Sequence, residues 1–183
     1  MPSIHTQKTH TTAVVLIPPQ DVWTPIQEIR STHDRNFHRW MPHITMLYPF
    51  AERESFHAVM PTLAEAAAGV KPFAVQLARF SHFRQRRYCT LFLMPTPEGE
   101  IIQLHARLTQ ALPDFDDTGR YAGGFHPHLS VGQFQHQQIA DAQARFQANW
   151  APIAFTVAGV SLIYRAPETD DRFVVAETFP LVG

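Results

Sequence analysis

Two histidines, each followed two positions later by a hydroxyl residue, are the side chains of this sequence best placed to do chemistry. His43 with Thr45 and His128 with Ser130 share one frame: an aromatic residue, any residue, proline, histidine, an aliphatic residue, a hydroxyl residue and an aliphatic residue. A third such pair, at positions 10 and 12, lacks this frame. Because the frame occurs once in each half of the chain, it indicates that the two pairs belong to one functional site.

The spacing of each pair predicts where its side chains point. Residues two apart on a β-strand face the same side of the sheet. Each histidine and its hydroxyl residue are therefore expected to face one side, while the aliphatic neighbours, such as Ile44 and Leu129, face a core. If an approximate two-fold axis relates the halves, the two pairs face each other across a cleft.

Two histidines and two hydroxyls around one small volume suit a phosphodiester. A neutral imidazole can take a proton from a nucleophile, and a protonated imidazole can give one to the leaving oxygen. The hydroxyls of Thr45 and Ser130 can donate hydrogen bonds to the non-bridging phosphate oxygens, where charge changes in the transition state. The alternative is that His43 and His128 are strand histidines whose hydrogen bonds only stabilise the core.

The elements that must position these residues follow a repeated order. Apolar runs of strand length alternate with segments whose apolar residues recur at helical spacing. The order strand, helix, strand, helix, strand occurs over about 13–83 and again over about 88–165, with a final strand at about 171–180. Strands are expected at 13–18, 43–50, 73–83, 88–94, 128–134 and 155–164, and helices at 21–33, 55–68, 99–112 and 138–150. The pattern predicts an internally duplicated, bilobal α+β protein, with residues 1–183 as one domain and 1–12 as a flexible tail.

Composition excludes several classes of protein. The 183 residues contain one cysteine, Cys89, so there is no disulfide framework. A net charge of −1 argues against binding to long duplex nucleic acid or an anionic membrane. No apolar run has the length of a membrane helix, and residues 1–12 lack a signal-peptide core, which together predict a cytoplasmic protein. His126 and His128 have no carboxylate or third histidine nearby at ligand spacing, so neither a metal nor another cofactor is expected.

The segments PHITMLYPF at 42–50 and PHLSVGQF at 127–134 resemble the signatures of the 2H phosphoesterase superfamily, which includes 2′-5′ RNA ligase-like proteins and cyclic phosphodiesterases. The resemblance implies a bilobal α+β fold with two antiparallel sheets flanking a central cleft and helices outside. It also implies His43 and His128 as catalytic residues, Thr45 and Ser130 as phosphate-binding residues, and no metal. The implied chemistry is the opening or closing of 2′-5′ or 2′,3′-cyclic phosphodiester bonds.

Further substrate contacts are expected from the residues around these motifs. Arg84, Arg87 and Tyr88 lie in a predicted hairpin turn that could overhang the cleft, where arginine grips phosphate and an aromatic ring stacks on a base. Tyr48 extends the first motif strand, and Arg165 is a further candidate for a phosphate contact. We expect a monomer that takes a nucleotide or an RNA terminus and hydrolyses its phosphodiester. The alternative is a non-catalytic module that binds nucleotides or RNA ends in the same cleft.

Overall fold

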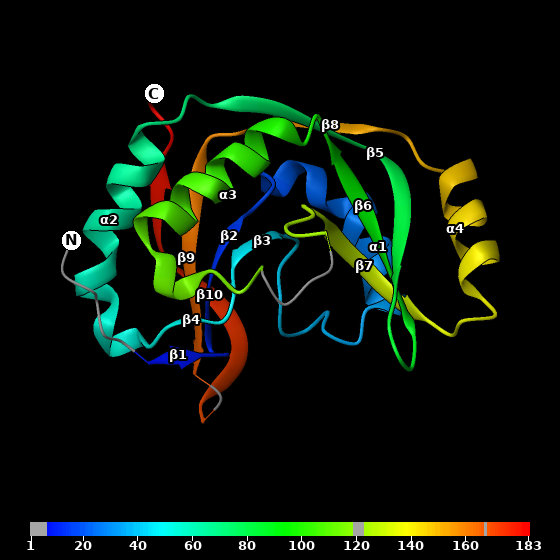
Figure 1. Cartoon of the computed structure of the whole chain (residues 1–183). Helices are drawn as coiled ribbons and strands as arrows, with labels where there is room; N and C mark the ends of the chain where they lie inside the picture. Colours follow the sequence, from blue (N-terminus) through cyan, green and yellow to red (C-terminus); the bar gives the residue numbers. More distant parts are fainter. Residues whose placement is uncertain (1–6, 119–122, 167) are drawn as a thin grey trace.

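The computed structural model describes residues 7–118, 123–166 and 168–183, which form ten strands and four α-helices in these ranges (Figure 1). The strands are β1 (Lys8–Thr9), β2 (Thr12–Leu16), β3 (Ile44–Leu47), β4 (Phe50–Ala51), β5 (Phe73–Arg84), β6 (Cys89–Thr96), β7 (Leu129–Phe134), β8 (Ile153–Val157), β9 (Gly159–Ala166) and β10 (Asp170–Pro180). The helices are α1 (Trp23–His33), α2 (Phe56–Ala68), α3 (Gly99–Ala111) and α4 (Ile139–Ala148), and short 3₁₀ turns lie at Gln20–Val22, Arg53–Ser55 and Pro113–Phe115.

Two four-stranded antiparallel sheets form the framework, as expected for the α+β class. One has the order β10-β9-β2-β3 and the other the order β7-β6-β5-β8, and every neighbouring pair is antiparallel. The strands that carry the two motifs, β3 and β7, occupy corresponding edges of the two sheets. The duplicated order of elements therefore brings the motifs to equivalent positions.

The two halves of the chain exchange a strand. β5, the last strand of the first half, lies beside β6 in the second sheet, and β9 of the second half lies beside β2 in the first. One expectation is corrected here, because the single strand predicted at 155–164 is two strands, β8 and β9, which belong to different sheets. The chain changes sheet at Ala158, whose carbonyl accepts a hydrogen bond from Leu181 N at 2.9 Å. The apolar run continues through this corner, so its composition gives no sign of the change.

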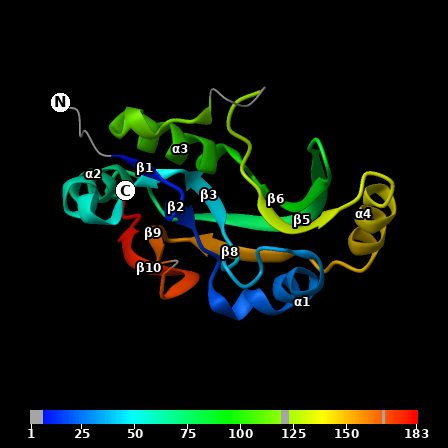
Figure 2. The same ribbon diagram turned by 90° about the horizontal axis from the view of Figure 1, so that it is seen from below.

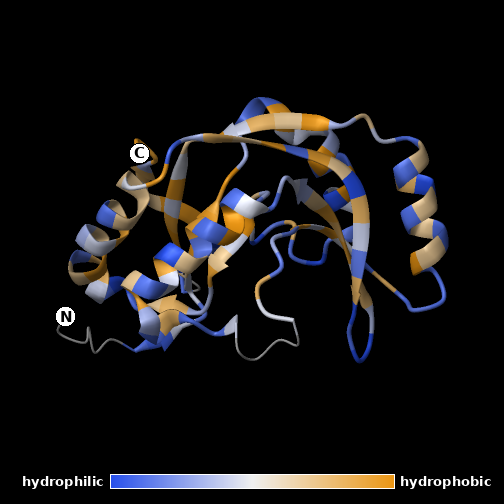
Figure 3. Ribbon diagram, turned by 45° about the horizontal axis from the view of Figure 1, so that its top comes forward, coloured by the Kyte–Doolittle hydropathy of each residue, from blue (hydrophilic) through white to orange (hydrophobic). Residues whose placement is uncertain are grey.

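Helices cover the sheets from outside, and one of them crosses between the halves. α1 packs mainly against β7, the motif strand of the other half. α2 packs against α3 and β10, and α4 packs against β5, so these helices lie at opposite ends of the molecule (Figures 1 and 2). β2 is buried along its whole length, which explains its unbroken apolar run. In Figure 3 the strands are largely apolar, whereas the tip of the β5–β6 hairpin is strongly polar.

The segment expected as a flexible tail is partly structured. β1 pairs antiparallel with β4, with Lys8 opposite Ala51 and Thr9 opposite Phe50, and β2 begins at Thr12. Residues 1–6 lie outside the described residues. Within the described ranges, no helix is both long and apolar enough to cross a membrane.

Candidate functional site

The two motif histidines are held by the same backbone device. His43 and His128 each stand directly before an edge strand, and Nδ1 of each ring lies 2.7 Å from a carbonyl oxygen two residues earlier, that of Met41 and that of His126. A carbonyl can only accept, so Nδ1 carries the proton and donates in both rings. Nε2 is therefore the nitrogen left with a lone pair in the neutral form. The repeated arrangement gives two imidazoles in the same tautomer.

Aromatic side chains surround both rings. Trp40 stacks on His43 with ring centroids 4.5 Å apart and an interplanar angle of 17°. Phe83 and Phe92 contact His128 edge to face, with centroids at 4.9 Å and 5.3 Å. These contacts fix the ring orientations and keep water from much of each imidazole.

This burial favours the neutral rings. The pKa of His43 is lowered to about 4, chiefly because burial disfavours the charged ring, and the positive charges of Arg30 and His128 act in the same direction. The pKa of His128 is also lowered, again chiefly by burial. Both rings are thus proton acceptors at neutral pH in the unliganded protein.

The hydroxyl residues follow the histidines, and a β-bulge follows each hydroxyl residue. Thr45 pairs with Val15 before the register shifts, and Ser130 pairs with Phe92 before the equivalent shift. Both side chains are half-buried, and neither hydroxyl has a hydrogen-bond partner among the described residues. Two unengaged donors therefore lie beside the two histidines.

A cavity of about 690 Å³ lies between the sheets next to these residues. Four of the predicted site residues line it: Thr45, Tyr48, Arg84 and His128. His43 and Ser130 are half-buried and are not among its lining residues. The cavity is therefore built from both motifs, with the second histidine in its wall and the first beside it.

Only one end of the predicted hairpin faces this cavity. Arg84 lines it, but Arg87 and Tyr88 do not. The Tyr88 hydroxyl accepts a hydrogen bond from Arg35, whose guanidinium lies over the Tyr88 ring, 4.2 Å from its centroid. The tyrosine ring is thereby engaged outside the cavity, while Arg87 is exposed.

Tyr48 reaches the cavity because of the bulge in β3. Strict alternation from Thr45 would turn Tyr48 to the opposite face of the sheet. The register shift after Thr45 leaves Met46 without its own partner and puts Leu47 in the core. The next residue then returns to the side of Thr45.

His105 of α3 is a cavity residue that the sequence does not reveal. It is only 6% exposed, lines the cavity and stacks on Phe125 with centroids 3.8 Å apart and an interplanar angle of 6°. Its place in the apolar stripe with Ile101, Leu104 and Leu108 is the signal that could have identified it as inward-facing. Burial lowers its pKa.

A buried ion pair joins the first motif to the second. Arg30 Nε donates to Asp34 Oδ2 at 2.9 Å, and Arg30 Nη2 donates to the Trp40 carbonyl at 2.8 Å. Gln133 of β7 donates from Nε2 to Asp34 Oδ1 at 3.3 Å. The pair thus fixes the segment that holds Trp40 against His43 and ties it to the opposite motif strand.

No group of three or more histidine, cysteine, aspartate or glutamate side chains is arranged to hold a metal ion in the described part of the chain. The chemistry that the arrangement can perform with its own groups is proton transfer at two imidazole Nε2 atoms and hydrogen bonding from two hydroxyls.

Comparison with known proteins shows what the whole chain is similar to. The sequence profile of the 2′-5′ RNA ligase superfamily matches residues 18–169. The sequence is 25% identical over 172 residues to that of a Geobacillus kaustophilus protein named as a phosphoesterase. The match covers 93% of this chain and 95% of that protein. The fold is similar to that of a Thermus thermophilus protein, TT0787, with a TM-score of 0.61, 19% identity and coverage of 94% and 98% of the two chains. It is also similar to E. coli LigT in complex with 3′-AMP, with a TM-score of 0.60, 16% identity and coverage of 97% and 100%.

Proposed function

Because the chain belongs to the 2′-5′ RNA ligase superfamily of 2H phosphoesterases, we propose that it is a phosphodiesterase whose two motif histidines are the general acid and base. Its proposed substrates are 2′,3′-cyclic or 2′-5′ phosphodiesters of RNA ends or small nucleotides, hydrolysed without a metal ion.

The main support for this proposal is that the same backbone contact holds the two imidazoles in the same tautomer. His43 and His128 each have Nδ1 bound to a backbone carbonyl at 2.7 Å, which leaves Nε2 as the reactive nitrogen of each ring. A core histidine needs no such repetition in the two halves of a fold. Two bases in the same tautomer beside one cavity are suited to move one proton each.

The proposed step transfers two protons around the phosphorus. Nε2 of one neutral imidazole takes a proton from the attacking water, whose oxygen forms the new bond to phosphorus. Nε2 of the other, protonated imidazole gives its proton to the ribose oxygen as the old bond to phosphorus breaks. The bound phosphate supplies the negative charge that raises the pKa of this second ring above its value in the unliganded protein. Thr45 and Ser130 donate to the non-bridging oxygens.

The test compares the wild type with His43→Asn and His128→Asn. Asparagine keeps an N–H near the Nδ1 position but has no second titratable nitrogen, so each variant removes the proton transfer while keeping the backbone contact. Each is expected to lose about 10²–10⁴-fold in kcat with 2′,3′-cyclic and 2′-5′ substrates. Because the two rings act as one unit, the double variant should lose much less than the product of the single losses.

Three results would change the proposal. Wild-type turnover that persists in the double variant would exclude the two histidines. Activity that disappears with a chelator and returns with one metal ion would exclude the metal-independent mechanism. Tight nucleotide binding without product would favour the alternative, a non-catalytic module that binds nucleotides or RNA ends.

A further inference from the structure

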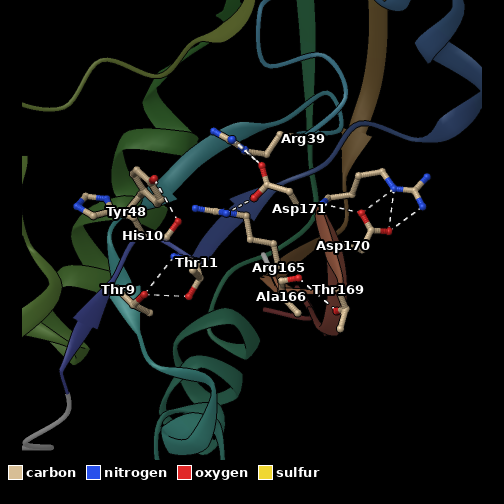
Figure 4. A network of polar contacts seen from close by, with 11 residues as sticks. Thr9, His10, Thr11, Arg39, Tyr48, Arg165, Ala166, Thr169, Asp170 and Asp171 are labelled. Atoms are coloured by element: carbon tan, nitrogen blue, oxygen red, sulfur yellow. Dashed lines mark hydrogen bonds and ion pairs between the residues drawn. The ribbon is translucent and has the colours of Figure 1, made fainter.

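Two arginines and one aspartate form a cluster, which Figure 4 shows together with Tyr48 of the first motif. Arg39, in the segment after α1, donates from Nε to Asp171 Oδ2 at 2.7 Å. Arg165 of β9 donates from Nη1 to the other oxygen of the same carboxylate. One carboxylate therefore serves two guanidinium groups, and the cluster keeps a net positive charge.

The cluster leaves hydrogen-bonding capacity unused. The Arg165 side chain is 15% exposed, and its Nε is buried without an acceptor in the described part of the chain. The carboxylate is more open, because the Asp171 side chain is 43% exposed. Both side chains of the Arg39–Asp171 pair are 43% exposed. Exposed ion pairs contribute little to stability, so an incoming anion can replace the carboxylate at this pair at small cost. A phosphate would offer three acceptor oxygens where Asp171 offers two.

Tyr48 connects this cluster to the catalytic cavity. Its side chain lines the cavity. The Arg165 guanidinium lies over the Phe173 ring, 5.7 Å from its centroid, and Phe173 packs on Trp40 with ring centroids 3.8 Å apart. On its other side Tyr48 contacts Trp40, with ring centroids 5.5 Å apart, and Trp40 is the ring that stacks on His43. The two arginines thus lie on the His43 side of the cleft, separated from that histidine by two aromatic rings.

We propose that Arg39 and Arg165 form a second anion subsite, which takes the 5′-phosphate of a nucleotide whose 2′- or 3′-phosphate lies between the motif histidines. In the unliganded protein Asp171 occupies the subsite as an internal anion. The ligand phosphate displaces it and hydrogen-bonds to both guanidinium groups. This inference rests on the proposed function, because the position of the first phosphate is taken from it.

The test measures binding, so that it does not depend on turnover. Isothermal titration calorimetry compares adenosine 2′-monophosphate with adenosine 2′,5′-bisphosphate, two ligands that differ only in the 5′-phosphate. The wild type should bind the bisphosphate about tenfold more tightly, as expected for a new charge-assisted contact at a partly exposed site. Arg39→Met and Arg165→Met should each remove most of this preference. The ratio of the two dissociation constants is the readout, because general damage to the fold weakens both ligands together.

A variant of opposite sign and two matched controls sharpen the test. Asp171→Asn removes the competing anion, so it should increase the preference for the bisphosphate severalfold. Arg172 and Asp170, on either side of Asp171 at the start of β10, pair with each other, with Arg172 Nη2 2.7 Å from Asp170 Oδ2. Arg172→Met and Asp170→Asn should therefore keep the wild-type ratio.

The outcomes separate this inference from the proposed function. Equal affinity of the wild type for both nucleotides would overturn the second subsite and leave the catalytic proposal intact. An equal loss of preference in Arg172→Met and Arg165→Met would also overturn it, because the effect would then be one of general charge. Failure of the wild type to bind either nucleotide, together with no turnover, would overturn both.

Discussion

Acidification should destabilise the wild-type protein more than a His43→Asn variant. The folded state lowers the pKa of His43 from 6.5 to about 4, chiefly by burial. The unfolded chain therefore binds a proton at this ring below about pH 6.5, whereas the folded chain resists binding until about pH 4. The stability that the folded protein keeps by holding His43 neutral is therefore fully present above about pH 6.5, and it is lost as the pH falls towards 4.

The size of the effect follows from this shift. At about pH 5 the unfolded ring lies about one and a half pKa units on the protonated side, and each unit corresponds to about 1.4 kcal/mol. The free energy of unfolding should thus fall by about 2 kcal/mol between about pH 7.5 and pH 5 through His43 alone. Because the ring is half-buried rather than fully enclosed, solvent reduces this figure, and we expect between about 1 and 2 kcal/mol.

Urea denaturation at both pH values, for the wild type and for His43→Asn, measures this contribution. Other buried histidines, such as His128 and His105, also have lowered pKa values, so both proteins should lose stability at low pH. The difference between the two losses isolates His43. His38→Asn, which removes an exposed histidine of the same segment, is the matched control. Parallel losses in the wild type and His43→Asn would refute the buried, neutral state assigned to this ring.

Two further substitutions test how the site is held. Gly132→Ala would place a Cβ 2.7 Å from His33 Cβ and 3.1 Å from its carbonyl oxygen, so urea denaturation should show a loss of about 1–3 kcal/mol. Gly99→Ala, whose Cβ meets no atom within 4 Å, should lose nothing, and equal losses would contradict close packing of α1 on β7. Arg30→Met leaves Asp34 buried without its cation and should cost about 3–5 kcal/mol in the same assay. An unchanged denaturation midpoint would show that the ion pair does not hold this segment.

Much of the fold can be predicted from local patterns. The helix expected at 99–112 is α3 (Gly99–Ala111), because its apolar residues recur at a clear helical spacing. The sheet change at Ala158 could not be predicted, because both flanking strands are apolar and the direction of the turn depends on tertiary contacts. The order at Lys8 and Thr9, within the segment expected to be a flexible tail, could not be predicted for a similar reason. Both residues are polar, and only their pairing with β4 orders them.

The sequence predicts the arrangement of some residues around the candidate site and misses that of others. A repeated frame predicts that the backbone holds His43 and His128 in the same way, since repetition of sequence produces repetition of backbone geometry, and both rings have the same Nδ1 contact at 2.7 Å. It does not identify His105, because one histidine in an apolar helical stripe looks like any other core position. Tyr88 was expected to contact the substrate, but it lies outside the cavity. Its place in a hairpin turn does not indicate which side of the turn faces Arg35, and the contact with Arg35 holds the tyrosine away from the cavity.

The exchange of β5 and β9 between the sheets bears on how both histidines came to share one chain. A polypeptide with only one β-α-β-α-β unit would leave its third strand unpaired, and two copies could complete their sheets by giving that strand to each other. The two motifs would then come from separate molecules, and the pair of histidines would exist only where the copies associate. When the β5–β6 hairpin joins the two copies in one chain, the contact between them becomes intramolecular, and its strength no longer depends on the protein concentration. In the joined chain, both histidines are brought together at any dilution.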